Sequence, residues 1–153
     1  MKTNALRILE SNNISFTTNC YNVNEEALDA VTVAKKIGVE EEKVFKTLVA
    51  KGDDNIYVFC IPGNYELNLK KAAAAANVKR IELLPLKELT NVTGYIRGGC
   101  SPVGMKKLFP TFIDETAMLF DTVFVSAGVR GLQMELKSDD LCKIISAKYK
   151  DLI

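Results

Sequence analysis

Hydrophobic and polar positions repeat with two different periods along this chain, and each period predicts a different kind of element. Apolar residues spaced three and four apart predict helices. Ala27, Val31 and Ala34 have this spacing, and Gly38 is a typical stop for the helix that they form. Ser138 precedes two aspartates, which is typical of an N-cap. Helices are expected over residues 4–12, 27–37, 69–76, 86–90 and 138 to about 149.

Runs of apolar or alternating residues predict strands between these helices. Residues 44–51 and 55–62 flank Gly52-Asp53-Asp54, which is a hairpin signal. Both faces of the second run are apolar, as is typical of a central strand. Strands with helices at both ends and short connections predict an α+β or mixed-sheet fold. Further extended segments are expected at residues 15–22, 111–114, 122–126 and 132–136, and an irregular one at 94–104.

Length and composition narrow the class of protein. A chain of 153 residues predicts a single domain, 1–153. Hydrophobic residues make up 48% and charged residues 25%, which excludes a disordered chain. The longest apolar run, Ile56 to Ile61, is too short to cross a bilayer, which takes about 20 residues. The first residues contain no apolar core of a secretion signal. We therefore expect a cytoplasmic protein without membrane association.

The chain contains no histidine, and this excludes several chemistries. Ser-His-Asp and Cys-His catalysis and histidine-ligated zinc are ruled out. The four cysteines contain no CxxC pair, so a thiolate zinc centre is not expected either. We expect free thiols, no metal and no cofactor, with Cys20, Cys60 and Cys142 as small core residues. Proton transfer is left to lysine, carboxylate, hydroxyl, water or the substrate.

Charge is concentrated in the middle of the chain. The net charge is +1, but residues 64–109 carry eight basic and three acidic side chains. This segment either faces a polyanion or forms a solvated helix face, and the pattern leaves both open. A nearly neutral protein binds nucleic acid weakly, so an RNA substrate would need a partner protein to deliver it.

Lys46 stands out because it lies inside a predicted strand. Alternation places Lys46 on the same face as Val44 and Leu48. A lysine there is either a guard of an edge strand or a buried charge directed at a site. In the second case its ammonium would hold a phosphate or carboxyl oxygen, or stabilise a developing negative charge.

Two glycine-containing segments are candidate site walls. Residues 94–104 contain four glycines in eleven positions, so that a ligand can approach main-chain N–H groups, although a plain loop has the same composition. Cys100 within it is a candidate nucleophile whose pKa Arg97 and Lys106 would lower, but no base is nearby in sequence. Residues 126–132 form either a hairpin connection or a second wall. Ser126 has no histidine to activate it.

These segments together resemble the YbaK-type aminoacyl-tRNA deacylases, which are related to the editing domain inserted in bacterial prolyl-tRNA synthetases. The resemblance covers nearly the whole chain. Its motifs are Asn4-Ala5, Ile14-Ser15-Phe16, Val44-Phe45-Lys46-Thr47-Leu48, Leu69-Lys70-Lys71, Gly94-Tyr95, Gly98-Gly99-Cys100-Ser101-Pro102-Val103-Gly104, Val125-Ser126-Ala127-Gly128 and Arg130-Gly131-Leu132.

The resemblance implies a mixed β-sheet curled toward a barrel, with flanking helices. It implies catalytic roles for Lys46 and for the loop residues Gly98, Gly99 and Ser101 around the aminoacyl ester. Some members carry an acidic residue at the position of Gln133, so no catalytic role is carried over to that residue. The substrate-binding residues implied are Tyr21, Thr47, Cys100, Pro102, Gly104, Ser126, Gly128 and Arg130.

The resemblance also implies hydrolytic editing of mischarged tRNA, chiefly Cys-tRNA(Pro), in trans and in partnership with prolyl-tRNA synthetase. The bound cysteine's thiol would attack its own ester, so that no protein nucleophile is needed. The chain would supply attack geometry and an oxyanion site. Two alternatives remain: a deacylase for another amino acid, such as Ala-tRNA(Pro), and a non-catalytic module that binds tRNA ends or a synthetase.

Overall fold

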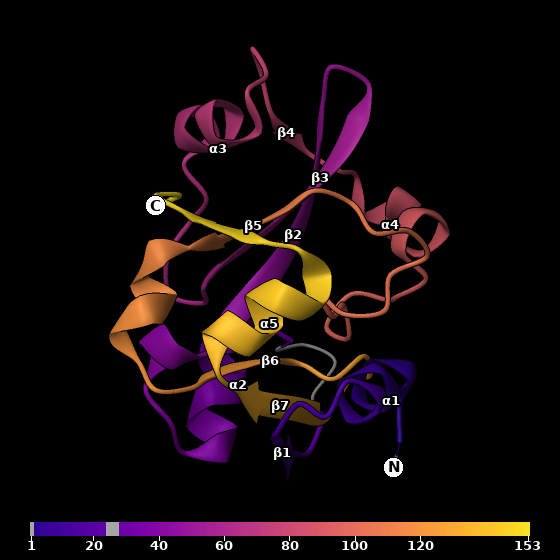
Figure 1. Ribbon diagram of the computed structural model, residues 1–153, viewed down its shortest axis with the longest axis vertical. Coiled ribbons are helices and arrows are strands. Elements are labelled where there is room, and N and C mark those ends of the chain that lie inside the picture. Colours follow the sequence, from indigo (N-terminus) through magenta and orange to yellow (C-terminus); the bar gives the residue numbers. More distant parts are fainter. Residues whose placement is uncertain (1, 24–27) are drawn as a thin grey trace.

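The computed structural model describes residues 2–23 and 28–153, and in this part of the chain eight strands form two sheets (Figure 1). The smaller sheet has the order β1-β7-β6 and is antiparallel throughout. The larger sheet has the order β4-β2-β3-β5-β8 and is mixed. The strands are β1 (Thr17–Cys20), β2 (Phe45–Gly52), β3 (Asn55–Pro62), β4 (Glu82–Leu83), β5 (Thr111–Asp114), β6 (Val123–Ser126), β7 (Leu132–Leu136) and β8 (Lys148–Lys150).

Helices cover both sheets. The α-helices of the described residues are α1 (Asn4–Ser11), α2 (Ala30–Ile37), α3 (Leu69–Ala76), α4 (Leu86–Thr93) and α5 (Ser138–Ile145), and Glu41–Lys43 and Glu115–Leu119 form short 3-10 helices. These elements confirm the predicted α+β class. Of the second predicted helix, Val31 and Ala34 lie in α2, whereas Ala27 lies outside the described residues.

The hairpin between β2 and β3 confirms the turn signal in the sequence. Asp53 and Asp54 both adopt positive φ angles, 49° and 65°, as a tight two-residue hairpin turn requires. The predicted central position of β3 is also confirmed, because β3 lies between β2 and β5. Its two faces are buried in separate clusters, with Val58 and Cys60 in one and Phe59 and Ile61 in the other.

Three apolar clusters hold the layers together. The largest fills the space between the two sheets and includes Leu9 of α1 and Leu141 of α5. A second lies under α3, where the rings of Phe59 and Phe112 stack at 5.6 Å. A third, small cluster packs α2 against the outer face of the three-stranded sheet. Its buried members are Val33, Ala34, Val44 and Phe124.

The predicted curl toward a barrel is wrong. Each sheet is open and has two edge strands, which are β1 and β6 in one and β4 and β8 in the other. In the described part of the chain, the backbone hydrogen bonding between the two sheets is limited to one isolated parallel bridge, between Val44 and Phe124. A barrel would need a continuous ladder of hydrogen bonds between β2 and β6.

The last predicted helix is too long. The helix ends at Ile145, its C-cap Ser146 adopts φ +53°, and residues 148–150 form β8 beside β5 instead. Its N-cap is Lys137, without a side-chain cap, so Ser138 is the first helical residue rather than the cap. The left-handed conformation at Ser146 turns the chain back along the sheet.

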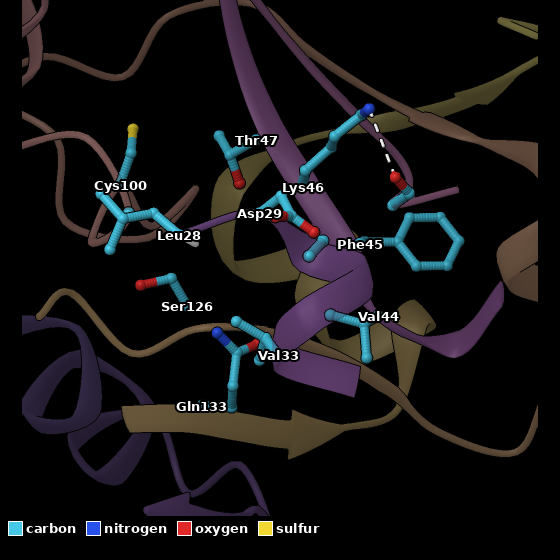
Figure 2. Close-up of a pocket in the computed structure, with 13 residues that line it drawn as sticks. Leu28, Asp29, Val33, Val44, Phe45, Lys46, Thr47, Cys100, Ser126 and Gln133 are labelled. Carbon is cyan, nitrogen blue, oxygen red and sulfur yellow. Dashed lines mark hydrogen bonds between the residues drawn. The ribbon is translucent and has the colours of Figure 1, made fainter. Parts of the chain in front are cut away.

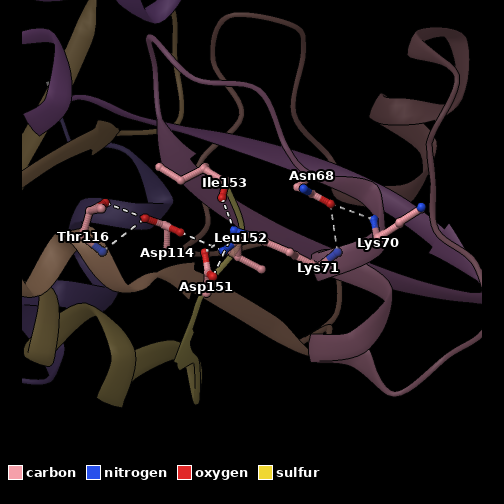
Figure 3. Close-up of polar contacts among 8 residues, drawn as sticks. All are labelled: Asn68, Lys70, Lys71, Asp114, Thr116, Asp151, Leu152 and Ile153. Carbon is pink, nitrogen blue, oxygen red and sulfur yellow. Dashed lines mark hydrogen bonds and ion pairs between the residues drawn. The ribbon is translucent and has the colours of Figure 1, made fainter.

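Residues after β8 are fastened to the larger sheet (Figure 3). Leu152 is fully buried, and its N–H donates to a carboxylate oxygen of Asp114 at 2.9 Å. The other Asp114 oxygen accepts from the N–H and hydroxyl of Thr116. The ammonium of Lys71 bonds Asp151 at 3.0 Å and the carbonyl of Ile153 at 2.5 Å. Lys71 is therefore engaged within the protein and does not form part of a free basic face.

Candidate active site

A cavity of about 170 Å³ lies between β2, α2 and the three-stranded sheet, and Val44 of the bridge to Phe124 lines it (Figure 2). Pockets that hold a whole small-molecule ligand usually measure about 300–1,000 Å³, so this one suits a single small group. It is lined by Leu28, Asp29, Ala30, Val33, Val44, Phe45, Lys46, Thr47, Gly63, Gly98, Cys100, Ser126 and Gln133.

Five residues that the sequence singled out line this cavity: Lys46, Thr47, Gly98, Cys100 and Ser126. They come from three segments that are far apart in the chain. β2 supplies the first two, the irregular segment after α4 supplies the next two, and β6 supplies the last. Tertiary structure therefore gathers one amide-rich loop, one ammonium and two hydroxyls around one small space.

The other expected site residues lie behind or away from the cavity. Ser101 is fully buried, and its hydroxyl accepts from the N–H of Val103 at 3.2 Å. Pro102 and Gly104 line a separate groove against α5, and Tyr21 lies beside Cys20 and Lys36 in another. Gly99, Gly128 and Arg130 belong to the packing that supports the loop.

The glycine loop is held against the turn between β6 and β7. A Cβ atom at Gly99 would lie 3.1 Å from main-chain atoms of Val129 and Arg130, so a side chain there would push this turn away by a few tenths of an ångström. The Nε of Arg130 donates to the carbonyl of Arg97 at 2.8 Å. Gly98 has a φ of +83°, which favours glycine. The turn thus serves as a support for the loop.

Tyr95 fixes the far end of the same loop. Its hydroxyl donates to the carbonyl oxygen of Val103 at 2.5 Å. The same hydroxyl lies within 2.8 Å of where a side chain at Gly104 would begin, and a ring carbon lies within 3.1 Å of the corresponding position at Gly128. Burial raises the pKa of Tyr95 to about 12, so the phenol stays protonated and remains a donor at neutral pH.

Main-chain N–H groups of the loop are unequally available. Gly99 donates to the carbonyl of Ile96 at 3.0 Å, which removes it from the set of oxyanion donors expected from the sequence. Within residues 2–23 and 28–153, the N–H groups of Gly98 and Cys100 have no acceptor, and both residues line the cavity. Of the loop residues that line the cavity, Gly98 and Cys100 therefore carry N–H groups that can donate to a ligand.

Lys46 lies at an open strand edge and also lines the cavity, so both interpretations of its position in the sequence apply. β4 pairs with β2 only at Ala50 and Lys51, so the stretch around Lys46 faces an open edge. The side chain also lines the cavity, and its Nζ lies 3.4 Å from the carbonyl oxygen of Gly63. Partial burial lowers the pKa of Lys46, while the negative charges of Glu66 and Asp29 act in the opposite direction.

The thiol of Cys100 is not activated. Burial raises its pKa to about 11, and a hydrogen bond with Thr93 offsets this only in part. The expectation that Arg97 and Lys106 would lower this pKa is therefore wrong, because loss of solvent dominates and the group that lowers the pKa is Thr93. Cys60 is buried as expected, but Cys20 is exposed and is not a core residue.

Two residues of the cavity wall, Asp29 and Gly63, were not predicted from the sequence. Asp29 is the N-cap of α2, and its carboxylate accepts from the N–H and the hydroxyl of Thr32, which lowers its pKa. The helix expected over residues 27–37 places Asp29 inside it, whereas the structure makes Asp29 the cap of a helix that begins at Ala30. Gly63 follows β3, and a side chain there would overlap Ala30. In the sequence, a glycine directly after Pro62 predicts a turn, and no local pattern indicates that it would line a cavity.

Gln133 also lines the cavity, from the central strand β7. It pairs directly with Ser126 across the sheet and is only 5% exposed. Among the described residues, no cluster of three or more histidine, cysteine or acidic side chains is placed to hold a metal ion. The same part of the chain contains no helix of the length and apolarity needed to span a membrane.

The sequence of this chain is similar to a known protein family and to several named proteins. The family described as "Aminoacyl-tRNA editing domain" matches residues 24–144. A protein of Enterococcus faecalis named "Putative Cys-tRNA(Pro)/Cys-tRNA(Cys) deacylase EbsC" is 43% identical over 99% of this chain and 93% of its own length. A proline–tRNA ligase of Shouchella clausii is 28% identical over 69% of this chain and 19% of its own length.

Solved structures support the same fold. The structure titled "Crystal structure of a putative trans-editing enzyme for prolyl tRNA synthetase" has a TM-score of 0.82 at 22% identity, covering 99% of this chain and 98% of that one. Another, titled "Crystal structure of hypothetical protein APE2540", has a TM-score of 0.86 at 20% identity, covering 95% and 96%. The family match extends over most of the chain and includes all the cavity-lining segments, and the chain belongs to the aminoacyl-tRNA editing domain family.

Proposed function

We propose that this protein removes the amino acid from mischarged tRNA, and that its main substrate is Cys-tRNA(Pro). The observation that carries the proposal is the convergence of Lys46, the Gly98–Cys100 loop and Ser126 on one small cavity in a chain of the editing family. The name of the Enterococcus faecalis relative points to the same substrate. The size of the cavity suits a small aminoacyl group, with the nucleotide outside.

The reaction needs no nucleophile from the protein, because an aminoacyl ester is already activated. In the proposed step the cysteine sulfur attacks its own ester carbonyl carbon, and a sulfur–carbon bond forms. The bond to the tRNA 3′ oxygen breaks, and the thiol proton ends on that oxygen. Water then opens the cyclic thioester and releases cysteine. The raised pKa of Cys100 is consistent with a protein thiol that takes no part.

The chain contributes position and electrostatics. The N–H groups of Gly98 and Cys100 are the donors available to the ester oxygen as its charge develops. Walls from α2 and β6 restrict the aminoacyl group to a folded shape in which the thiol reaches the carbonyl. No group on the protein has to change its covalent state.

Lys46 acts at the rim of the cavity in this proposal. Its Nζ is directed toward Gly63, away from Ser126 and Gln133 (Figure 2). This position favours a contact with a phosphate of the tRNA 3′ end over a contact with the ester itself. Recognition of the rest of the tRNA is assigned to a partner, prolyl-tRNA synthetase, because the chain's own net charge is only +1.

A deacylation assay with a panel of charged tRNAs tests the function. Cys-tRNA(Pro), Ala-tRNA(Pro), Ser-tRNA and Pro-tRNA(Pro) are incubated with the purified protein, with and without prolyl-tRNA synthetase. We expect rapid loss of cysteine, much slower loss of serine, and no loss of proline. Equal rates for cysteine and serine would replace the thiol step with an activated water. No deacylation of any substrate, together with retained tRNA binding, would make the protein a non-catalytic module.

A further inference from the structure

The amide of Gln133 is a buried polar group whose oxygen has no hydrogen-bond partner. Its side chain extends from β7 into the space between Val33 and Ser126 (Figure 2). Gln133 is 5% exposed and Ser126 8% exposed, and they lie directly opposite each other on adjacent strands. Among the buried side-chain oxygens and nitrogens of the described residues, the Oε1 of Gln133 alone lacks a partner.

A buried acceptor without a donor is unfavourable, so its persistence at a cavity wall needs an explanation. No surrounding side chain donates a hydrogen bond to it. Val33, Val44 and Phe45 are apolar, and the hydroxyl of Ser126, which accepts from the N–H of Gly128 and keeps its own proton, makes no hydrogen bond with the amide oxygen. A donor carried by the ligand would satisfy the Oε1 of Gln133 when the cavity is occupied.

An aminoacyl group has two parts that could donate to Gln133, its α-ammonium and its side chain. The charges around the cavity decide between them. Among the described residues that line the cavity, Asp29 is the one carboxylate, and it is exposed at the start of α2. An ammonium placed beside Gln133 would lose its water next to apolar side chains without a counter-charge. The α-ammonium is therefore better placed toward Asp29, and the neutral side chain of the amino acid reaches Gln133.

We propose that Gln133 is a specificity-determining residue that accepts a hydrogen bond from the side chain of the bound amino acid. The preferred side chains are then small and end in a donor, either S–H or O–H, and alanine is disfavoured because it leaves the amide oxygen unpaired. This inference rests on the proposed function, since it places an aminoacyl group in the cavity. In this proposal Gln133 selects the side chain that binds, and the thiol of the bound cysteine makes the ester react.

Binding of unreactive analogues tests recognition without chemistry. The probes are 3′-amino-3′-deoxyadenosine carrying cysteine, 2-aminobutyrate, serine or alanine in amide linkage. Cysteine and 2-aminobutyrate have nearly the same shape, but the second has a methyl group in place of the S–H donor. We expect the cysteine analogue to bind the wild-type protein about tenfold more tightly than the 2-aminobutyrate analogue, the scale of one buried hydrogen bond. We expect the serine analogue to exceed the alanine analogue likewise.

Variants identify the residue responsible. Gln133→Met keeps the length of the side chain and removes both polar atoms, and we expect it to abolish the preference for cysteine over 2-aminobutyrate. Asn19→Ala is the matched control, because Asn19 pairs with Gln133 from the other side of β7 but does not line the cavity. The preference should be unchanged in this control.

Failure of this inference is distinguishable from failure of the proposed function. Equal affinities of the wild-type protein for the cysteine and 2-aminobutyrate analogues would overturn the role of Gln133 even if Gln133→Met failed to fold. An unchanged preference in folded Gln133→Met would do the same. Either result leaves the deacylation of Cys-tRNA(Pro) intact, whereas an inactive wild-type protein in the tRNA panel contradicts the function itself.

Discussion

The ammonium nitrogen of Lys46 lies 3.4 Å from the carbonyl oxygen of Gly63, and both residues line the same cavity. The contact joins the start of β2 to the residue that follows β3. Among the described residues of the cavity wall, Lys46 is the one lysine, and this contact directs its ammonium toward Gly63.

Replacement of this lysine should impair editing. We expect Lys46→Ala to lower kcat/KM for Cys-tRNA(Pro) by about 100-fold, the scale of a lost electrostatic contact in an enzyme site. A rise in KM with little change in kcat would assign Lys46 to phosphate binding, and a fall in kcat would assign it to the ester. Lys51→Ala, on the same strand but outside the cavity, serves as the control. Near-normal deacylation by Lys46→Ala would remove Lys46 from the mechanism.

The thiol of Cys100 should be a poor nucleophile despite its place in the cavity. Its pKa of about 11 lies two units above the ordinary 9.0, so the thiolate is about 100-fold scarcer at pH 8 than in an unperturbed cysteine. We expect iodoacetamide to modify the exposed Cys20 first, as read by mass spectrometry. Because folding favours the protonated form, Cys100 also favours the folded state below pH 9, and this contribution declines between about pH 9 and 11.

Cys100→Ala should accordingly keep its deacylase activity within a few-fold of the wild type. Loss of chemistry in a variant that folds and still binds the analogues would restore the thiol as a catalytic group. Alkylation of Cys100 ahead of Cys20 at pH 8 would contradict the raised pKa.

The close contact between Gly99 and the β6–β7 turn should be required for activity. The backbone at Gly99 does not adopt a positive φ, so alanine fits its conformation but not its space. We expect Gly99→Ala to displace the loop from Val129 and Arg130 and to lower kcat/KM at least tenfold. Circular dichroism and thermal unfolding would show whether the fold is retained.

Gly38→Ala provides the matched comparison for that variant. A side chain at Gly38 meets no atom within 4 Å, but its φ of +75° is strained for alanine. We expect a loss of about 1 kcal/mol in the free energy of unfolding and an unchanged kcat/KM. Similar kinetics in the two glycine variants would argue that the loop contact has no catalytic consequence.

The buried carboxylate of Asp114 should contribute to stability without contributing to catalysis. Asp114→Ala removes the acceptor of the buried Leu152 N–H and of Thr116 (Figure 3). We expect urea unfolding to show a loss of about 3 kcal/mol. Glu115→Ala, at the exposed neighbouring position, should change stability by less than about 0.5 kcal/mol. Equal stabilities of the two variants would show that residues 151–153 are not held through Asp114.

Local patterns predicted most of the elements because neighbouring residues determine them. The two aspartates after Gly52 specify a hairpin turn, and the two apolar faces of β3 specify a central strand. β8 escaped prediction because Ser146 ends α5 in a left-handed conformation that serine seldom adopts. A helical pattern of apolar residues continues past it, so that nothing local signals the stop.

The cavity was only partly predictable because its walls depend on tertiary packing. Lys46 and the glycine loop have unusual local patterns, and both reach the cavity. Ser101 belongs to the same loop but turns inward to bond Val103, which composition does not reveal. The sequence distinguishes Gln133 only by the acidic residue that some members of the family carry at its position, and the burial of its unpartnered oxygen emerges only from the fold.

Among the described residues, an isolated backbone bridge from Val44 to Phe124 joins the two sheets beside the cavity. Val44 and Phe124 are both buried in the small cluster under α2, together with Val33 and Ala34. Val33 and Val44 also line the cavity, so the side chains that pack α2 onto the sheet form part of its wall. A substitution in this cluster is therefore expected to change the shape of the cavity as well as the stability of the fold.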